Sequence, residues 1–274
     1  MGASAASPNL ARLRRASLLG RLKLRKKLSN GDLYLDYGWI KLLFSDDGDR
    51  QELYYHLNQG LWRSTDLPLF SKYIEPGATV IDVGANMGFV TTMLASLVGP
   101  TGLVMSFEPS FTTYEKLLKT IAANDLTQVS PRNMGLGSKR ETKDLISISR
   151  SSGNNTLLPT TGGSAESRES IELMKLDEAS ELQDHRVTFI KIDTEGFELQ
   201  VLDGARELVV RDKPIIYTEL GGGGSYTHST LRVIEFLEEH GYDTSHVSGI
   251  DWQGVGNGAD FTFVPIEMVG RAPE

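Results

Sequence analysis

A strand–turn–helix pattern near the middle of the chain constrains the fold more than any other feature. Thr79–Val83 is an apolar run of strand length, and Phe89–Leu97 continues as an apolar helix. The turn between them contains Gly84, Asn86 and Gly88, residue types that tolerate left-handed backbone conformations. This pattern opens a βαβ fold, so we predict a ligand site at the carboxyl end of the first strand.

Short apolar runs alternate with helical periodicity after Pro76-Gly77, which predicts an α/β fold with a mostly parallel sheet and helices on both faces. The strands are expected near Thr79–Val83, Leu103–Phe107, Val129–Asn133, Val187–Asp193, Ile215–Glu219 and Phe261–Val264. Ser110 and Ser229 are expected to cap helices, the second of which stops at Gly241. A polar loop is expected at 150–170.

Composition and charge divide the chain into three segments. Residues 1–31 contain several lysines and arginines and no acid, so we expect a flexible basic extension. Residues 32–75 are rich in aromatics and are expected to form a cap or substrate wall, with strands or a hairpin around 46–48 and helical turns over 51–74. Residues 76–274 form the main domain.

Several classes of protein are excluded by composition. The absence of cysteine removes disulfides, Cys-ligated zinc and thiol nucleophiles. The net charge is −8 although the first segment is basic, so the rest is acidic and nucleic acid is not an expected partner. We expect no transmembrane segment and no signal peptide, hence a cytoplasmic protein, with membrane-surface contact through the basic extension as an alternative. The oligomeric state is not determined by the sequence.

A second acid follows the next predicted strand, in Phe107-Glu108-Pro109-Ser110. A carboxylate there can accept two hydrogen bonds from a ribose diol. A dinucleotide fingerprint would need glycine at Phe89, and no Lys-Ser or Lys-Thr pair of a phosphate-binding loop follows the glycines. The spacing from Asp82 through the turn to Glu108 resembles class I S-adenosylmethionine-dependent methyltransferases, whose cationic cofactor tolerates an acidic wall. A turn whose glycines serve only packing is the alternative.

Acids also end two later strands. Asp193 ends the expected strand Val187–Asp193 and Glu195 lies just after it, with a helix expected to start near Glu195 or Gly196. Glu219 ends the strand that begins at Ile215. Because these strand ends are expected at the same edge of the sheet, the three carboxylates are candidates for a role near a methyl acceptor. They could also supply hard oxygen ligands to a divalent cation, but we do not expect a metal requirement.

His228 is a further candidate, because an unperturbed histidine titrates near neutrality and suits a general base. It follows Gly221–Gly224, a hinge-like run that could carry a moving lid. Glu198 is expected to stabilise the first turn of a helix through the helix dipole rather than to act in catalysis.

Taken together, these blocks resemble the FkbM-type methyltransferases over about residues 70–220. The Lys191–Glu198 block, Lys-Ile-Asp-Thr-Glu-Gly-Phe-Glu, narrows the resemblance beyond generic class I enzymes. The resemblance implies a Rossmann-like class I methyltransferase fold with S-adenosyl-L-methionine as cofactor. The implied cofactor-binding residues are Asp82, Gly84, Ala85, Asn86, Gly88, Glu108, Pro109, Ser110 and Asn133.

The resemblance implies O-methylation of a hydroxylated small molecule such as a sugar, a glycolipid or a secondary metabolite. An alcohol needs a general base to become a good nucleophile, and Asp193, Glu195, Glu219 and His228 are the candidates. N-methylation of an amine or of a protein side chain is the alternative reaction. A non-catalytic cofactor-binding protein is the alternative from a different class.

Overall fold

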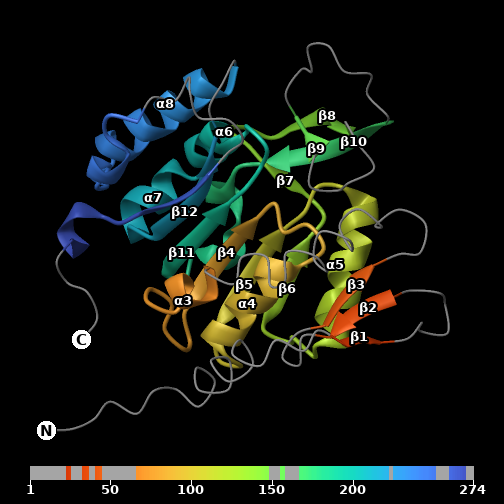
Figure 1. The fold of residues 1–274 in the computed structure, drawn as a ribbon. Coiled ribbons are helices and arrows are strands. Elements are labelled where there is room, and N and C mark those ends of the chain that lie inside the picture. Colours follow the sequence, from red (N-terminus) through yellow and green to blue (C-terminus); the bar gives the residue numbers. More distant parts are fainter. Residues whose placement is uncertain are drawn as a thin grey trace, which may run out of the picture.

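A six-stranded sheet forms the centre of the structure (Figure 1), a computed structural model that describes residues 23–25, 33–36, 41–44, 66–147, 155–157, 167–221, 225–250 and 259–269. The strand order is β13-β12-β11-β4-β5-β6. All neighbouring pairs are parallel except β12 and β13. The strands are β4 (Thr79–Val83), β5 (Leu103–Phe107), β6 (Val129–Arg132), β11 (Val187–Ile192), β12 (Ile215–Leu220) and β13 (Ala259–Phe263). The six predicted strands and the mostly parallel α/β sheet are therefore confirmed.

Helices cover both faces of this sheet (Figure 1). One face packs against α3 and α4, and the other packs against α6, α7 and α8. The helices are α3 (Asp66–Phe70), α4 (Phe89–Val98), α5 (Phe111–Ala123), α6 (Glu198–Asp203), α7 (Arg206–Asp212) and α8 (Ser225–Glu239). Single turns of 3-10 helix occur at Leu176–Glu178, Ser180–Leu182, Ser245–Val247 and Ile266–Met268.

The central strands β4 and β11 are mostly apolar because both of their faces are buried, with Asp82 and Lys191 as the charged exceptions. Along β4, Val80 packs on the α4 side, while Ile81 and Val83 pack on the opposite side. The α4 side also holds an aromatic group in which the ring of Phe70 lies edge-on to Phe189 and Tyr217, with centroids 5.1 and 4.9 Å apart. This packing fixes β4, β11 and β12 side by side.

A second sheet, of order β7-β10-β8-β9, was not expected from the sequence. Its strands are β7 (Gly135–Leu136), β8 (Glu141–Ser147), β9 (Asn155–Thr156) and β10 (Ser167–Met174). The prediction of a loop over 150–170 is wrong at 155–156 and 167–170, which lie in β9 and β10. β10 alternates buried Ile171 and Leu173 with exposed polar residues, so a strand with one wet face looked like a polar loop.

Two helix starts and one helix cap differ from the sequence analysis. Ser110 precedes α5, but its side chain makes no capping hydrogen bond. Ser229 lies inside α8, which begins at Ser225, and α6 begins at Glu198 rather than near Glu195. The expected end at Gly241 is confirmed, since α8 ends at Glu239 and Gly241 has a positive φ of 76°.

The N-terminal segment contributes a small antiparallel sheet, β1-β2-β3, formed by Lys23–Arg25, Leu33–Asp36 and Lys41–Phe44. Its strand β3 lies beside α5 (Figure 1). The turn expected at 46–48, the helical turns expected over 51–65 and most of the basic extension lie outside the described residues.

Replacing Gly84 by alanine is expected to destabilise the fold far more than replacing Gly99. Both glycines have positive φ, 73° and 67°, so alanine adds backbone strain of about 1 to 3 kcal/mol at either position. At Gly84 a Cβ would lie 1.9 Å from the backbone oxygen of Asp193, whereas at Gly99 it would meet no described atom within 4 Å. Urea unfolding should give a loss several times larger for Gly84→Ala. Equal losses would contradict this close approach of two backbones.

Candidate active site

The turn after β4, residues 84–88, has the backbone conformation that the sequence predicts. Gly84, Asn86 and Gly88 have positive φ values of 73°, 50° and 93°. The backbone N–H groups of Gly84 and Ala85 donate to the carbonyl of Phe107, each at 3.0 Å, and so join the turn to the end of β5. Left-handed geometry at Asn86, a residue with a side chain, stores strain of the kind found at functional sites.

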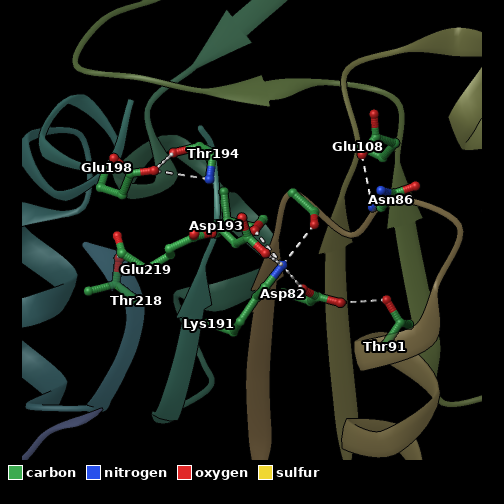
Figure 2. Close-up of polar contacts among 12 residues, drawn as sticks. Asp82, Asn86, Thr91, Glu108, Lys191, Asp193, Thr194, Glu198, Thr218 and Glu219 are labelled. Atoms are coloured by element: carbon green, nitrogen blue, oxygen red, sulfur yellow. Dashed lines mark hydrogen bonds and ion pairs between the residues drawn. The ribbon is translucent and has the colours of Figure 1, made fainter. Parts of the chain in front are cut away.

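Glu108 fixes the other side of this turn (Figure 2). Its Oε2 accepts the backbone N–H of Asn86 at 2.9 Å, and its Oε1 accepts that of Ser110 at 3.0 Å. The side chain is buried, and burial raises its pKa to about 7 against the lowering effect of both hydrogen bonds. Two accepted bonds leave part of the carboxylate's capacity of about four lone-pair sites.

Asn133 lies just after β6 and supports the same loop. Its amide Nδ2 donates to the carbonyls of Glu108 and Pro109, both at 3.0 Å. The expected cofactor-side residues therefore gather at the adjoining ends of β4, β5 and β6, where hydrogen bonds connect Asn86, Glu108, Ser110 and Asn133. Asp82 lies deeper, within β4, where its Oδ2 accepts the hydroxyl of Thr91 at 2.6 Å.

Lys191 connects this region to the next strand (Figure 2). It stands opposite Asp82 in the β4–β11 register and is 3% exposed. Its Nζ lies 3.3 Å from Asp82 Oδ1 and 3.5 Å from Asp193 Oδ2. It also donates to the carbonyls of Val83 at 3.3 Å and Gly84 at 2.8 Å.

Three of the four expected catalytic residues come together at the ends of β11 and β12. Asp193, Glu195 and Glu219 each offer a carboxylate oxygen, and these oxygens lie within 4.8 Å of one another. All three side chains are half-buried. Glu195 has a positive φ of 53°, a second case of left-handed backbone in a residue with a side chain.

The pKa of Glu195 is raised to about 8. Burial is the largest cause, and the negative charges of Asp193 and Glu219 add to it, while Lys191 opposes them. A carboxyl group with this pKa carries a proton at neutral pH and can exchange it in the range where general acid–base catalysis operates. A chemical role for the cluster is therefore compatible with its electrostatics.

Glu198 has a structural role through hydrogen bonds to the loop before α6, whereas the sequence analysis expected an effect through the helix dipole. Its Oε1 accepts the backbone N–H of Thr194 at 3.1 Å, the hydroxyl of Thr194 at 3.0 Å and the N–H of Gly196 at 3.0 Å (Figure 2). These bonds close the loop between β11 and α6. They hold Asp193 and Glu195 at the carboxyl edge of the sheet.

His228 does not join the three carboxylates. It is exposed on the first turn of α8, and no hydrogen bond or ion pair connects it to them among the described residues. Gly222–Gly224 lie outside the described residues, so the expected hinge stays a prediction.

Sequence reasoning missed Lys191 and Thr91 as site residues. A lysine inside the apolar run Phe189–Ile192 was a usable signal, because a charged residue in a fully buried strand needs a partner. Thr91 offered no such signal, since its role depends on how α4 lies against β4. The structure also gives a different reason why position 84 needs glycine. The backbone of Asp193 occupies the space where a Cβ at position 84 would lie.

The doubly wound sheet, with one antiparallel edge strand and a glycine turn after its central strand, has a Rossmann-like architecture. A family model described as the methyltransferase FkbM domain matches residues 82–244, and the chain belongs to this family. The expected resemblance is therefore confirmed. The expected cofactor, S-adenosylmethionine, agrees with this family.

The individual proteins that this chain resembles have low sequence identity to it. Methyltransferase sdnD of Sordaria araneosa is 27% identical where it aligns, over 47% of this chain and 60% of that protein. The chain thus spans about 60% of this curated relative. Among solved structures, methyltransferase FkbM of Methylobacillus flagellatus KT has 19% identity and a TM-score of 0.41, covering 84% of this chain and 52% of the other. M. jannaschii TYW2 in complex with AdoMet has 14% identity and a TM-score of 0.42, covering 89% and 90%.

Within the part of the chain that the structure describes, every helix is too short or too polar to traverse a membrane.

The raised pKa of Glu195 predicts how stability depends on pH. A glutamate titrates near 4.5 when unfolded and this one near 8 when folded, so the folded state binds more protons between these values. The free energy of unfolding should therefore fall as pH rises from about 5 to 8. Glu195→Gln mimics the protonated form and should reduce this fall by about 3 kcal/mol.

Urea unfolding at several pH values measures this effect. Glu172→Gln on β10 is the control, because Glu172 is exposed and its replacement should leave the pH dependence as in the wild type. The same pH dependence in Glu195→Gln and in the wild type would contradict the raised pKa.

Proposed function

We propose that this chain is an S-adenosylmethionine-dependent O-methyltransferase that acts on a hydroxyl group of a small molecule. The proposal rests on one observation: two sets of residues lie at the same edge of the sheet. The glycine turn and Glu108 lie at the ends of β4 and β5, and the carboxylates of Asp193, Glu195 and Glu219 lie at the ends of β11 and β12. Lys191 contacts both groups.

The chemistry of the first group suits the proposed cofactor. Glu108 retains acceptor capacity for a ribose diol after binding Asn86 and Ser110. The surrounding acids favour a ligand that carries a sulfonium and an ammonium group and no phosphate. Bound S-adenosylmethionine would supply an electrophilic methyl group. We assign Gly84, Ala85, Asn86, Gly88, Glu108, Pro109, Ser110 and Asn133 to its binding, with Asp82 as support beneath the turn.

The carboxylate cluster suits the acceptor side. A hydroxyl oxygen becomes a better nucleophile when a positioned base takes its proton, an effect of about 10²- to 10⁴-fold. We assign this role to the ionised form of Glu195, whose fraction grows as the pH rises toward its pKa of about 8; a carboxylate with that pKa is a stronger base than an ordinary one. Burial holds the pKa of Glu195 in that range, and the negative charges of Asp193 and Glu219 add to the effect. His228 receives no role in this proposal.

Three alternatives stay open to experiment. Methylation of an amine needs less base strength, and a screen of hydroxyl against amine acceptors separates it from the proposed reaction. A divalent cation on the three carboxylates is the second alternative, and activity that survives EDTA after metal stripping would exclude it. Turnover of labelled cofactor with any acceptor would exclude a non-catalytic binding protein.

The proposal also assigns a role to each of the three segments of the chain. We propose that residues 76–274 form the catalytic domain and that residues 32–75 help to shape the acceptor pocket. Residues 1–31 are proposed to be a basic extension. A cytoplasmic location is proposed because the cysteine-free composition suits a reducing compartment.

Removing the Glu108 carboxylate should weaken cofactor binding. Glu108→Ala loses the proposed ribose acceptor and the hydrogen bonds to Asn86 in the turn and to Ser110 after β5, so the Kd for S-adenosylhomocysteine should rise at least about tenfold. Isothermal titration calorimetry measures this Kd. Glu172→Ala is the control, because Glu172 is an exposed glutamate on β10. Absence of binding to the wild-type chain would refute the proposed function.

Removing the proposed base should affect turnover more than binding. Glu195→Gln should lower kcat at least about a hundredfold on an accepted substrate, while the Kd for S-adenosylhomocysteine stays within about threefold of wild type. Single-turnover kinetics with labelled cofactor measures the first quantity. An equal loss in kcat and in affinity would move Glu195 to the cofactor side.

A further inference from the structure

Lys191 is a buried cation in the centre of the sheet. Its neighbours along β11, Ile190 and Ile192, are apolar and buried, and its own side chain is 3% exposed. Taking an ammonium group out of water carries a large desolvation cost unless the group is paired and hydrogen-bonded. The position of Lys191 therefore depends on the groups that its Nζ contacts.

Those groups come from both halves of the proposed site. Asp82, Val83 and Gly84 belong to the end of β4 and the glycine turn, and Nζ contacts each of them. Its shortest contact, 2.8 Å, is to the carbonyl of Gly84. From the other half of the site, Asp193 Oδ2 lies 3.5 Å from Nζ of Lys191 (Figure 2).

Asp82 shows why the charge of Lys191 matters here. Its side chain is fully buried, and Thr91 binds only one of its two oxygens, Oδ2. The other oxygen, Oδ1, has no hydrogen bond among the described residues, and its ion pair with Lys191 at 3.3 Å is its polar contact. Without the ammonium, Asp82 and Asp193 would each lose a cation that lies 3.3 and 3.5 Å from their carboxylate oxygens.

We propose that Lys191 is a positioning residue that couples the glycine turn to Asp193 and sets the charge beneath the cofactor. Its ammonium holds the Gly84 carbonyl, and with it the turn, in the conformation that accepts the ligand. The same ammonium neutralises part of the negative charge of Asp82 and Asp193. This inference rests on the proposed function, because it assumes that the turn binds S-adenosylmethionine.

The two natural ligands distinguish this role from a purely structural one. S-adenosylmethionine carries a sulfonium cation, whereas S-adenosylhomocysteine has a neutral sulfur. Removing Lys191 makes the site more negative, so the affinity for the cationic ligand should increase relative to the affinity for the neutral one. Damage to the fold alone would weaken both ligands equally and leave the ratio of their affinities unchanged.

The experiment measures both Kd values by calorimetry for the wild type, Lys191→Met and Lys191→Arg. In Lys191→Met, the Kd for S-adenosylhomocysteine should rise at least about tenfold, and the preference for S-adenosylmethionine should grow at least about fivefold. Lys191→Arg keeps the charge but not the geometry. This variant should therefore raise both Kd values at least about fivefold. The ratio of the two Kd values should stay as in the wild type.

Lys213→Met is the matched control. Lys213 is half-buried and also donates to a backbone carbonyl, that of His240 at 2.6 Å, but it follows α7 on a different part of the fold. Its replacement should leave both Kd values within about twofold of wild type. Thermal unfolding followed by circular dichroism shows which variants are folded.

Each outcome has a distinct meaning. Absence of binding to the wild type refutes the proposed function itself. Binding to the wild type together with an unchanged affinity ratio in folded Lys191→Met overturns the positioning role. If Lys191→Met does not fold, Lys191→Arg decides: weaker binding at an unchanged ratio supports the role, and wild-type affinity overturns it.

Discussion

The close approach of the β4 and β11 strand ends is the constraint on which the site depends. The backbone N–H of Asp193 donates to the carbonyl of Val83 at 3.2 Å, and the Asp193 carbonyl occupies the space that a side chain at Gly84 would need. Glycine at 84 is therefore required by the protein's own packing. Because the two backbones touch, the glycine turn and the acidic loop form one unit.

Charge gives this unit a second connection. Lys191 lies beneath both loops, and its contacts with the Gly84 carbonyl and with Asp193 bridge the same two strand ends. Beyond it, Asp193, Glu195 and Glu219 leave a local excess of negative charge, which raises the pKa of Glu195. The acidic edge and the buried cation beneath it are the electrostatic features that a cationic cofactor and a proton-accepting base would use.

Much of this could be predicted from the sequence. Apolar runs bounded by turns predicted the six strands of the main sheet, and glycine with asparagine predicted the left-handed turn at 84–88, because those signals are local. The second sheet was missed, since β10 has one wet face and resembles a polar loop. The role of Lys191 was missed because it depends on the pairing of β4 with β11, which only the three-dimensional fold defines.

The most direct test of the account is a crystal structure with S-adenosylhomocysteine bound. The account predicts a ribose diol within hydrogen-bond distance of Glu108, with the sulfur at the edge that carries Asp193, Glu195 and Glu219. The space in front of the sulfur would then define the size of the methyl acceptor. A ligand bound elsewhere on the sheet, or a ribose that makes no contact with Glu108, would contradict the account.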